Sequence, residues 1–413
     1  MTQILSEQML NTFFNRLDEA WERKAVVWRS PSVGVIANEE EIFDALKRAA
    51  NVKIHGRSPR LSFYIENAEV FCNTRDYLPR SDEHSLEDYI SRIRNTIGNR
   101  RFALVADSLE VASFELWERA FCIFEPILQR YGWHRCTVGC FIGDIEFTPF
   151  GLHQDFHSTF LSVVSGEKRM HLWPPNFVYQ GKSITQWRYR NDYQSILAAS
   201  ELLSGGPGDW FYWPRDLFHV ADNPQGRLTV TLNIGISGTL LDARDLGKLT
   251  GEQLWPDFEK SFGGLMHGTR EGSVAALSAA AKSAYDYVIS ERVTLEQGLM
   301  RDMLSRVTAG GFKPPQLRSR IKLHETDLIR VAALHPIVLG ELNKNEFVLG
   351  ANGQTIVVSK HPEVLRLVNV LNGGNVVSVY ELIGSNALQK FDQQVILIDL
   401  LEQLLMTGTI ERV

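Results

Sequence analysis

The chain has 413 residues, which exceeds the usual size of a single hydrophobic core, so two or three domains are expected. Its composition is that of an ordinary globular protein, and a net charge of −6 with a pI near 6.0 disfavours a nucleic-acid-binding protein, which normally carries a basic stripe. No apolar run is long enough to predict a membrane span, and the N-terminus lacks the basic start and cleavage site of a secretion signal, so a cytoplasmic location is predicted.

The N-terminal third is predicted to consist of helices that decorate a sheet. Apolar residues at helical spacing predict a helix over residues 5–24, and the aliphatic and aromatic run that follows predicts a strand over 25–29. The same patterns predict further helices over 39–50, 85–97 and 114–130, and strands over 61–65, 101–105 and 136–147. We expect the last of these strands to begin a β-barrel.

The four cysteines, Cys72, Cys122, Cys136 and Cys140, are too few and too scattered for a disulfide framework, so reduced thiols are predicted. His134, Cys136 and Cys140 stand at alternate positions of one predicted strand and therefore share a face. Two interpretations remain open for this group. It is either a zinc site or, as buried strand cysteines usually are, a set of small packed side chains.

The stretch Gly151-Leu152-His153-Gln154-Asp155 lies in strand-like sequence, where His153 and Asp155 fall on the same face and can share a metal ion. The chain from there to His219 is long enough for several antiparallel strands to carry it around a barrel and back. The return begins with the turn cluster Gly205–Asp209 and continues as the aromatic run Trp210–Trp213, which predicts a buried strand.

Two imidazoles and one carboxylate can occupy one face of an octahedral metal site and leave three positions open for a chelating cosubstrate and O₂. His153, Asp155 and His219 are therefore predicted to be the metal ligands of a non-haem Fe(II) oxygenase. His157 also falls on the predicted strand face. It is either a fourth ligand, which would occupy one of the open positions, or a residue that faces the substrate or contacts a ligand. His171 is predicted to be structural.

The segments Thr148 to Lys168 and Pro207 to Asn233 resemble the JmjC-type, cupin-fold 2-oxoglutarate oxygenases that hydroxylate protein or peptide side chains. The resemblance includes Ser165-Gly166-Glu167-Lys168-Arg169 and the run Gly208–Pro214 as well as the metal motif. It implies a double-stranded β-helix, Fe(II), 2-oxoglutarate as cosubstrate, and O₂. It also implies that Lys168 pairs with the distal carboxylate of 2-oxoglutarate, and that Thr148 and Asn233 hydrogen-bond the cosubstrate.

The charge of Lys168 suits this role independently of the resemblance, because a cation beside an open metal site can anchor a dianionic keto acid through a charge-assisted hydrogen bond. The alternative is a lysine exposed in a turn. Between the two halves of the barrel, residues 180–190 form an aromatic and basic insertion. This insertion is either a solvated loop or, as loops at a barrel mouth often are, a contact surface for a substrate, which would then have acidic character.

After Asn233 the pattern changes to helices. The alanine-rich stretch 272–292 and residues 295–307 are predicted to be two helices whose small residues permit close packing. In the ribosomal oxygenases, a branch of the JmjC group with a similar order of domains, a helical segment in this place forms a homodimer, so the resemblance implies dimerisation here. Pro314-Pro315 and the basic residues 318–322 then predict a linker.

The last 80 or so residues are predicted to fold as a unit. Strands over 346–349 and 355–358 flank Asn352-Gly353, which is a strong hairpin signal. Pro362 begins a helix that ends at Gly373-Gly374, Ser378 and Glu381 form a capping box, and Asp392 caps a third helix before a final strand over 409–413. A hairpin with three helices resembles a winged helix.

Winged helices often bind DNA, but residues 336–413 carry five basic and eight acidic side chains, a net charge of −3. That balance does not favour binding to phosphates. A role in docking a protein or peptide is therefore predicted. The ribosomal oxygenases have a comparable C-terminal domain, and small winged-helix domains also recognise leader peptides in peptide-natural-product pathways.

The sequence thus predicts an α+β protein with a JmjC/cupin oxygenase domain over residues 1–238, a helical, dimerising segment and linker over 239–330, and a winged-helix-like domain over 331–413. The predicted function is Fe(II)- and 2-oxoglutarate-dependent hydroxylation of a side chain in a ribosomal protein, another protein or a precursor peptide. Two alternatives stay open. One is a non-catalytic, cupin-fold peptide-binding protein, and the other is a metal-dependent cupin enzyme that does not use 2-oxoglutarate and binds its metal through His157 as well.

Overall fold

A computed structural model describes residues 7–30, 34–51, 59–71, 74–132, 134–187, 193–223, 225–238, 282, 286, 292–332, 336–383 and 391–413. The chain divides into two compact units. Unit 1 comprises Met1–Ser237 with Gly310–Gln316, and unit 2 comprises Gly238–Ala309 with Leu317–Val413. Both units combine antiparallel sheets with helices, as the predicted α+β class requires.

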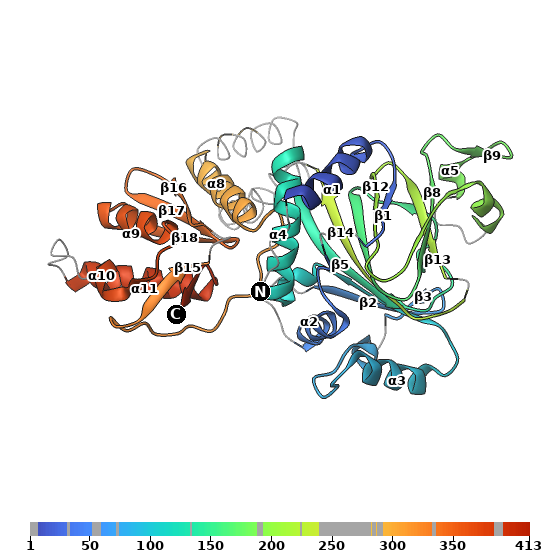
Figure 1. The fold of residues 1–413 in the computed structure, drawn as a ribbon, viewed down its shortest axis with the longest axis horizontal. Coiled ribbons are helices and arrows are strands. Elements are labelled where there is room, and N and C mark those ends of the chain that lie inside the picture. The colour runs from blue at the N-terminus through green and yellow to red at the C-terminus, as the bar shows by residue number, and fades with distance from the viewer. Residues whose placement is uncertain are drawn as a thin grey trace, which may run out of the picture. The chain divides into compact units, whose positions relative to one another are not determined.

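Unit 1 is built around two antiparallel sheets (Figure 1). The large sheet has eight strands in the order β1-β12-β7-β14-β5-β4-β2-β3, and the small sheet has the order β11-β8-β13-β6. The large-sheet strands are β1 (Val26–Trp28), β2 (Arg60–Ile65), β3 (Ala68–Glu69), β4 (Phe102–Asp107), β5 (Arg135–Gly143), β7 (Ser158–Ser165), β12 (Trp210–Trp213) and β14 (Thr229–Ser237). The small-sheet strands are β6 (His153–Gln154), β8 (Lys168–Trp173), β11 (Glu201–Gly205) and β13 (Phe218–Asp222).

From β5 onward the chain passes repeatedly between the two sheets. It runs from β5 in the large sheet to β6 in the small one, back to β7, across to β8 and β11, and then through β12, β13 and β14. The inner faces of the two sheets form one apolar layer that includes Leu161, Met170 and Trp213. Because the chain crosses so often, residues far apart in sequence meet in that layer.

Helices cover the outer face of the large sheet. Phe160 of β7 points outward and meets Phe124 of α4 edge-on at 5.2 Å, while Trp28 lies between Phe160 and Phe13 of α1. Since β7 and β12 are buried on both faces, neither shows an alternation of exposed and buried residues, and β12 reads as a continuous aromatic run. The helices of unit 1 are α1 (Glu7–Ala20), α2 (Glu39–Asn51), η1 (Thr74–Tyr77), α3 (Leu86–Ile97), η2 (Leu109–Ala112) and α4 (Phe114–Tyr131).

Local signals in the sequence set the ends of several of these helices. Ser85 accepts a hydrogen bond from the Asp88 backbone N–H while the Asp88 side chain accepts one from the Ser85 N–H, which is a complete capping box worth about 1 kcal/mol. The Ser113 hydroxyl likewise caps α4 by accepting a hydrogen bond from the N–H of Leu116.

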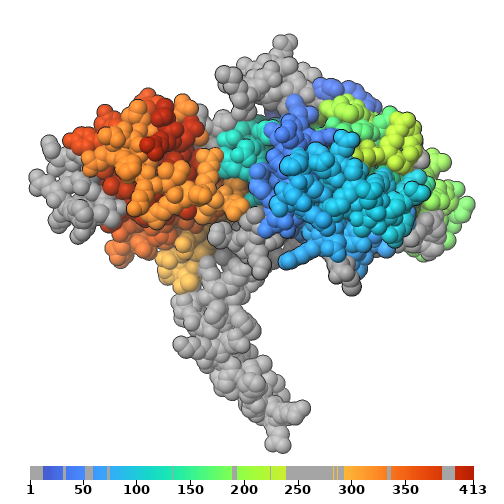
Figure 2. Space-filling view, turned by 90° about the horizontal axis from the view of Figure 1, so that it is seen from below, coloured from blue at the N-terminus to red at the C-terminus, as the bar shows by residue number. Residues whose placement is uncertain are grey.

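In Figure 2 the N-terminal part of the chain that contains α2 and α3, coloured blue to cyan, forms a large part of the visible face of unit 1.

An insertion between β8 and β11 lies on the outer face of the small sheet. It contains β9 (Val178–Tyr179), β10 (Lys182–Ser183), α5 (Ile184–Trp187) and η3 (Tyr193–Ala199). Trp187 and Ile196 pack with Trp173 and Val220 of the sheet in one buried cluster. The buried side chains of this insertion thus anchor it to the sheet, while Lys182, Thr185 and Gln186 are exposed to solvent.

Unit 2 contains two three-stranded sheets, with the orders β19-β15-β20 and β16-β17-β18. Their strands are β15 (Leu328–Val331), β16 (Val338–Glu341), β17 (Glu346–Ala351), β18 (Gln354–Ser359), β19 (Val377–Ser378) and β20 (Ile410–Arg412). The helices are α8 (Arg292–Thr308), α9 (Pro362–Asn372), α10 (Val379–Ile383) and α11 (Phe391–Met406). The predicted hairpin, its Asn352-Gly353 turn and the helix that begins at Pro362 are all present.

The structure differs from the prediction in two details of this unit. Strands β15 and β16 were not predicted, because both are short and half-exposed. β15 is stabilised by pairing with the distant strands β19 and β20, whereas β16 pairs with the next strand along the chain, β17. Helix α11 already begins at Phe391, so Asp392 lies in its first turn rather than at its cap. Most of the alanine-rich stretch 272–292, and with it the predicted dimer helix, lies outside the described residues. Among the helices that are described, none combines the length and the apolar character needed to cross a membrane.

Candidate active site

His153 and His219 face each other across two neighbouring strands. His153 begins β6, and the register of β6 and β13 places it directly opposite His219. Directly opposed side chains of an antiparallel pair lie about 5 Å apart at Cβ. The two imidazole rings accordingly approach to 4.2 Å between centroids. The tertiary pairing thus joins two residues that the sequence separates by more than 60 positions.

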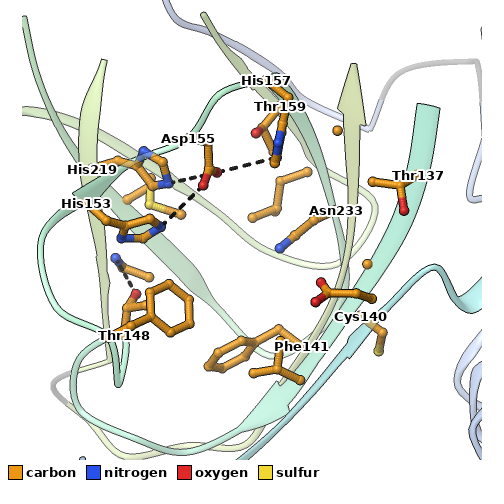
Figure 3. A pocket seen from close by; sticks show the side chains of 18 of the residues that line it. Thr137, Cys140, Phe141, Thr148, His153, Asp155, His157, Thr159, His219 and Asn233 are labelled. Atoms are coloured by element: carbon orange, nitrogen blue, oxygen red, sulfur yellow. Dashed lines mark hydrogen bonds and ion pairs between the residues drawn. The ribbon is translucent and has the colours of Figure 1, made fainter. Parts of the chain in front are cut away.

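Asp155 completes a group of three metal-ligating side chains (Figure 3). Each of His153, Asp155 and His219 offers one ligand atom, and the three atoms lie within 4.8 Å of one another. The Asp155 carboxylate is 3.4 Å from Nε2 of His219 and 3.9 Å from Nε2 of His153. Within the part of the chain that the structure describes, no other group of three His, Cys, Asp or Glu side chains meets this condition.

Backbone carbonyls orient both imidazoles. Nδ1 of His153 lies 2.9 Å from the Gly151 carbonyl oxygen, and Nδ1 of His219 lies 3.3 Å from that of Leu217. A carbonyl oxygen only accepts, so each Nδ1 carries a proton, which in the neutral imidazole is the Nδ1–H tautomer. This tautomer is the one in which Nε2 can bind a metal, and such hydrogen bonds commonly fix metal-binding histidines.

The local structure corrects one detail of the prediction. Strand β6 ends at Gln154, and residues 155–157 form the corner at which the chain leaves the small sheet for β7 of the large one. His153, Asp155 and His157 therefore do not lie on one strand face. Asp155 still reaches the two imidazoles because the corner turns it inward, whereas His157 arrives from the side of the large sheet (Figure 3).

The surrounding charges favour the ionised form of Asp155. Burial by itself raises the pKa of this carboxyl group, but the hydrogen bond and charge of His219, together with the charges of His157 and His153, hold the pKa below its ordinary value. Burial also lowers the pKa of His157, against the attraction of Asp155. The cluster thus offers an anionic oxygen and two imidazole nitrogens, a donor set that suits Fe, Zn, Cu and similar divalent metals.

A cavity of about 180 Å³ opens beside this cluster, between the two sheets. Leu161, Met170 and Trp213 form part of its apolar wall. Its polar wall includes Thr148, Lys168 and Asn233, the three residues that the resemblance assigns to the cosubstrate. All six residues that were singled out in the sequence for the metal and the cosubstrate therefore line one cavity.

Lys168 is the most unusual of these residues because it is only 6% exposed. It is the first residue of β8 and follows a tight turn at Gly166, where φ is +75° and a Cβ would lie 2.4 Å from the Leu228 carbonyl oxygen. Desolvation lowers the pKa of Lys168 to about 8, against the attraction of Asp222. Its ammonium lies 4.5 Å from the centre of the Phe141 ring, and no carboxylate of the described residues is within ion-pairing distance.

Thr148 and Asn233 each keep hydrogen-bonding capacity for a ligand. The Thr148 hydroxyl oxygen accepts from the Ala221 N–H at 2.9 Å, which leaves its own proton to donate. Oδ1 of Asn233 is buried and has no partner among the described residues. Asn233 lies on β14, the central strand between β5 and β7, and its side chain enters the cavity from the large sheet (Figure 3).

Two polar residues that sequence reasoning did not single out also matter here. Thr159, one strand across from Gly235, lines the cavity with a buried hydroxyl that has no hydrogen-bond partner among the residues that the structure describes. Asp222 is buried on β13, where it lies 3.0 Å from Nε of Arg169 and 3.1 Å from Nε2 of His171, and it is the carboxylate that acts on Lys168. No local signal identifies Asp222, because its partners belong to β8.

The histidine and the cysteines that the sequence analysis considered outside the metal cluster are packed in the interior of unit 1. His171, predicted to be structural, is buried with its Nδ1 2.7 Å from the Ser200 hydroxyl. Cys136 and Cys140 are buried, free thiols, and burial raises the pKa of Cys140 to about 12. The described residues bring no zinc-binding group together around these cysteines, so the packing interpretation of His134, Cys136 and Cys140 is favoured.

Comparison with known proteins identifies similar folds only. No protein-family model matches the chain, and none of the curated proteins does. Among solved structures, YcfD, a ribosomal oxygenase from Escherichia coli, is similar both in complex with cobalt and succinic acid and in complex with cobalt and 2-oxoglutarate. Each comparison gives 11% identity and a TM-score of 0.49, and covers 97% of this chain and 98% of the other.

Proposed function

We propose that this protein is an Fe(II)- and 2-oxoglutarate-dependent oxygenase that hydroxylates a side chain of a protein or peptide. In this proposal His153, Asp155 and His219 hold the iron, and Lys168 anchors the cosubstrate. The observation that carries the proposal is one cavity whose wall contains both the three-ligand cluster and a buried ammonium that no carboxylate of the described residues pairs with.

The donor set fits the metal. Two imidazole nitrogens and one carboxylate oxygen on one side of an ion leave three of six octahedral positions for ligands from solution. The Nδ1 hydrogen bonds of His153 and His219 hold both Nε2 lone pairs toward the shared site. The low pKa of Asp155 keeps its carboxylate ionised over the whole physiological range, so no proton competes with the metal there.

The cavity also fits a dicarboxylate. Keeping a lysine charged in a buried place is costly unless an anion completes the site. The distal carboxylate of 2-oxoglutarate can supply that anion, with Thr148 donating its hydroxyl proton to the same ligand. The Asn233 amide offers a further donor and a vacant acceptor from the large sheet.

Bound iron, with 2-oxoglutarate and O₂, would supply an oxidant for an unactivated C–H bond while the cosubstrate is converted to succinate and CO₂. The protein's own contribution is positioning and the exclusion of water. Leu161, Met170 and Trp213 place apolar surface beside the ligand cluster. Lys168, Thr148 and Asn233 hold the cosubstrate, and the apolar wall excludes water from the site where the substrate would react.

The fold and partners follow from the same proposal. We infer a double-stranded β-helix from the strand orders β5-β14-β7-β12 and β6-β13-β8-β11, in which each sheet draws alternately on the two halves of the chain. We further propose a winged-helix-like domain over residues 331–413 that docks the substrate in the cytoplasm, and a homodimer formed through residues 239–330. The ribosomal oxygenase YcfD suggests ribosomal proteins as the first substrates to screen.

Anaerobic spectroscopy tests the proposal. Adding Fe(II) and then 2-oxoglutarate to the metal-free chain should produce the weak visible charge-transfer band of an iron-bound keto acid. His153→Ala should remove the band, whereas His84→Ala, a change at an exposed histidine before α3, should keep it. A His153→Ala protein that retained the band and produced succinate would refute the ligand assignment.

A substrate screen completes the test. Candidate peptides from ribosomal proteins and from modified natural products should be incubated with the iron-loaded chain, 2-oxoglutarate and air, and measured by intact mass. A gain of one oxygen that requires 2-oxoglutarate is expected. A wild-type protein that binds iron but never forms succinate with any substrate would instead favour a non-catalytic peptide-binding cupin.

A further inference from the structure

His157 contacts the same carboxylate as the candidate metal ligands but does not belong to their group. Its Nε2 lies 3.4 Å from Oδ2 of Asp155, the oxygen that is also 3.4 Å from Nε2 of His219. Oδ1 of Asp155 is the atom nearer to His153, at 3.9 Å. In Figure 3 the carboxylate lies between His157 on one side and the His153–His219 pair on the other.

The imidazole of His157 is held in place by a glycine. A Cβ built on Gly235 of β14 would lie 2.7 Å from Cδ2 and 2.9 Å from Nε2 of His157, so the ring occupies the space that any other residue would fill. Phe156 meets the ring edge-on at 5.0 Å. His157 is thus confined against the floor of the large sheet, and its side chain remains 21% exposed.

The Asp155 carboxylate could bind a metal through one oxygen or through both, and the choice decides how many coordination positions stay open. If both oxygens chelate the ion, they occupy two coordination positions and leave fewer for ligands from solution. An N–H donor directed at one oxygen favours binding through the other. Hydrogen-bond partners of this kind typically change metal affinity about 10- to 100-fold when they are mutated.

We propose that His157 is a positioning residue, and that its Nε2–H, held against Gly235, donates to Asp155 and fixes the carboxylate for one-oxygen metal binding. This inference rests on the proposed metal cluster of His153, Asp155 and His219. It assigns to His157 the role of a contact to a ligand rather than that of a fourth ligand.

Cobalt binding by the full-length, metal-free chain tests the inference without any turnover. The affinity for Co²⁺ should fall about 10- to 100-fold in His157→Phe, which keeps a flat ring but lacks the donor. His157→Gln places an amide N–H near the original Nε2 and should restore most of the affinity. His84→Phe is the matched control at an exposed histidine and should bind as the wild type does.

Gly235→Ala tests the packing part of the inference. The added methyl group must displace the imidazole, so this variant should also bind Co²⁺ more weakly than the wild type. In a His157→Ala background there is no ring to displace, and the same glycine change should then have no further effect. Additive losses in the double variant would contradict the proposed coupling.

Proton NMR of the cobalt-loaded protein counts the imidazole ligands directly. Each histidine bound through Nε2 contributes one exchangeable, strongly shifted Nδ1–H signal. Two such signals are expected in the wild type and the same two in His157→Phe.

Three results would overturn the proposal in different ways. A third shifted signal in the wild type that His157→Phe removes would make His157 a ligand. Unchanged Co²⁺ affinity in His157→Phe would leave it without a role at the metal. A wild-type chain that binds no Co²⁺ at all would refute the metal cluster itself, and with it the proposed function.

Discussion

The burial of Lys168 predicts that this residue is costly for folding and necessary for ligand binding. Its ammonium is 6% exposed, and desolvation lowers its pKa from 10.5 to about 8. At 1.36 kcal/mol for each pKa unit, holding the charge in the folded, ligand-free protein at pH 7 costs about 3 kcal/mol. Lys168→Met keeps the length of the side chain and removes the charge, so the metal-free protein should gain up to about 3 kcal/mol of stability.

The pH dependence gives this prediction a sign. The folded-state pKa lies below the unfolded value, so between pH 8 and 10.5 the unfolded chain holds more protons than the folded one. The contribution of Lys168 to the free energy of unfolding therefore becomes more favourable as pH rises through that window. Lys168→Met should lose this dependence, and its advantage over the wild type should shrink from pH 7 to pH 10.

The same substitution should weaken binding of 2-oxoglutarate. Removing one partner of a buried, hydrogen-bonded charge pair costs about 2–5 kcal/mol, which corresponds to roughly 30- to several-thousand-fold in Kd. Urea unfolding of the metal-free chain would measure the gain in stability, and anaerobic calorimetry with the Mn²⁺-loaded chain would measure the loss of affinity. Lys24→Met, at a lysine whose side chain is 58% exposed, is the control and should change either quantity little.

Two results would refute this reasoning. If Lys168→Met destabilised the metal-free protein by several kcal/mol, the ammonium would be part of the folded core rather than reserved for a ligand. If the variant bound 2-oxoglutarate within twofold of the wild type, the cosubstrate would be anchored elsewhere. The combination of higher stability and lower affinity is specific to a buried cation that awaits an anion.

Three further predictions concern pH and backbone conformation. Because ligand-free Lys168 loses its proton near pH 8, the Kd for 2-oxoglutarate should rise by up to about tenfold per pH unit above that value. Calorimetry between pH 7 and 9.5 would measure this rise. A Kd that does not change with pH would contradict the role of Lys168 as the cosubstrate anchor. Burial raises the pKa of Glu110 to about 7, so between pH 4.5 and 7 the folded state binds a proton that the unfolded state has lost, and the free energy of unfolding should fall by about 3 kcal/mol as pH rises through that window. Urea unfolding of Glu110→Gln should show no such fall. An unchanged pH dependence in this variant would mean that another group causes it. Gly353 has φ +79° in the β17–β18 turn, so Gly353→Ala should destabilise unit 2 by about 1–2 kcal/mol in thermal unfolding. An unchanged midpoint temperature of unfolding would show that the turn adapts to the substitution.

Much of the fold could be predicted because its signals are local. The capping pair Ser378 and Glu381, the Asn352-Gly353 turn and Pro362 at the start of α9 each act within four residues of the chain, and each forms as predicted. Strand β15 was missed because it pairs only with β19 and β20, which lie far along the chain. Strand β16 was missed because its four residues are partly exposed and form a weak strand pattern before β17.

The candidate site divides in the same way. Its residue types could be chosen from the sequence, since a histidine-x-aspartate, a later histidine and a lysine after a glycine turn are recognisable in one dimension. The surroundings of Asp222 and Thr159 could not, because their partners come from other strands.

The sequence by itself determined which side chains are available for metal and cosubstrate chemistry and where most helices and turns lie, because these depend on residue type and short-range spacing. Only the tertiary structure decided that His219 lies opposite His153, that Lys168 is buried with no carboxylate partner in the described part of the chain, and that His157 rests on Gly235 beside Asp155. The physical reason is that strand register and burial arise from contacts between segments far apart in the chain, where a shift of one residue turns every side chain to the opposite face.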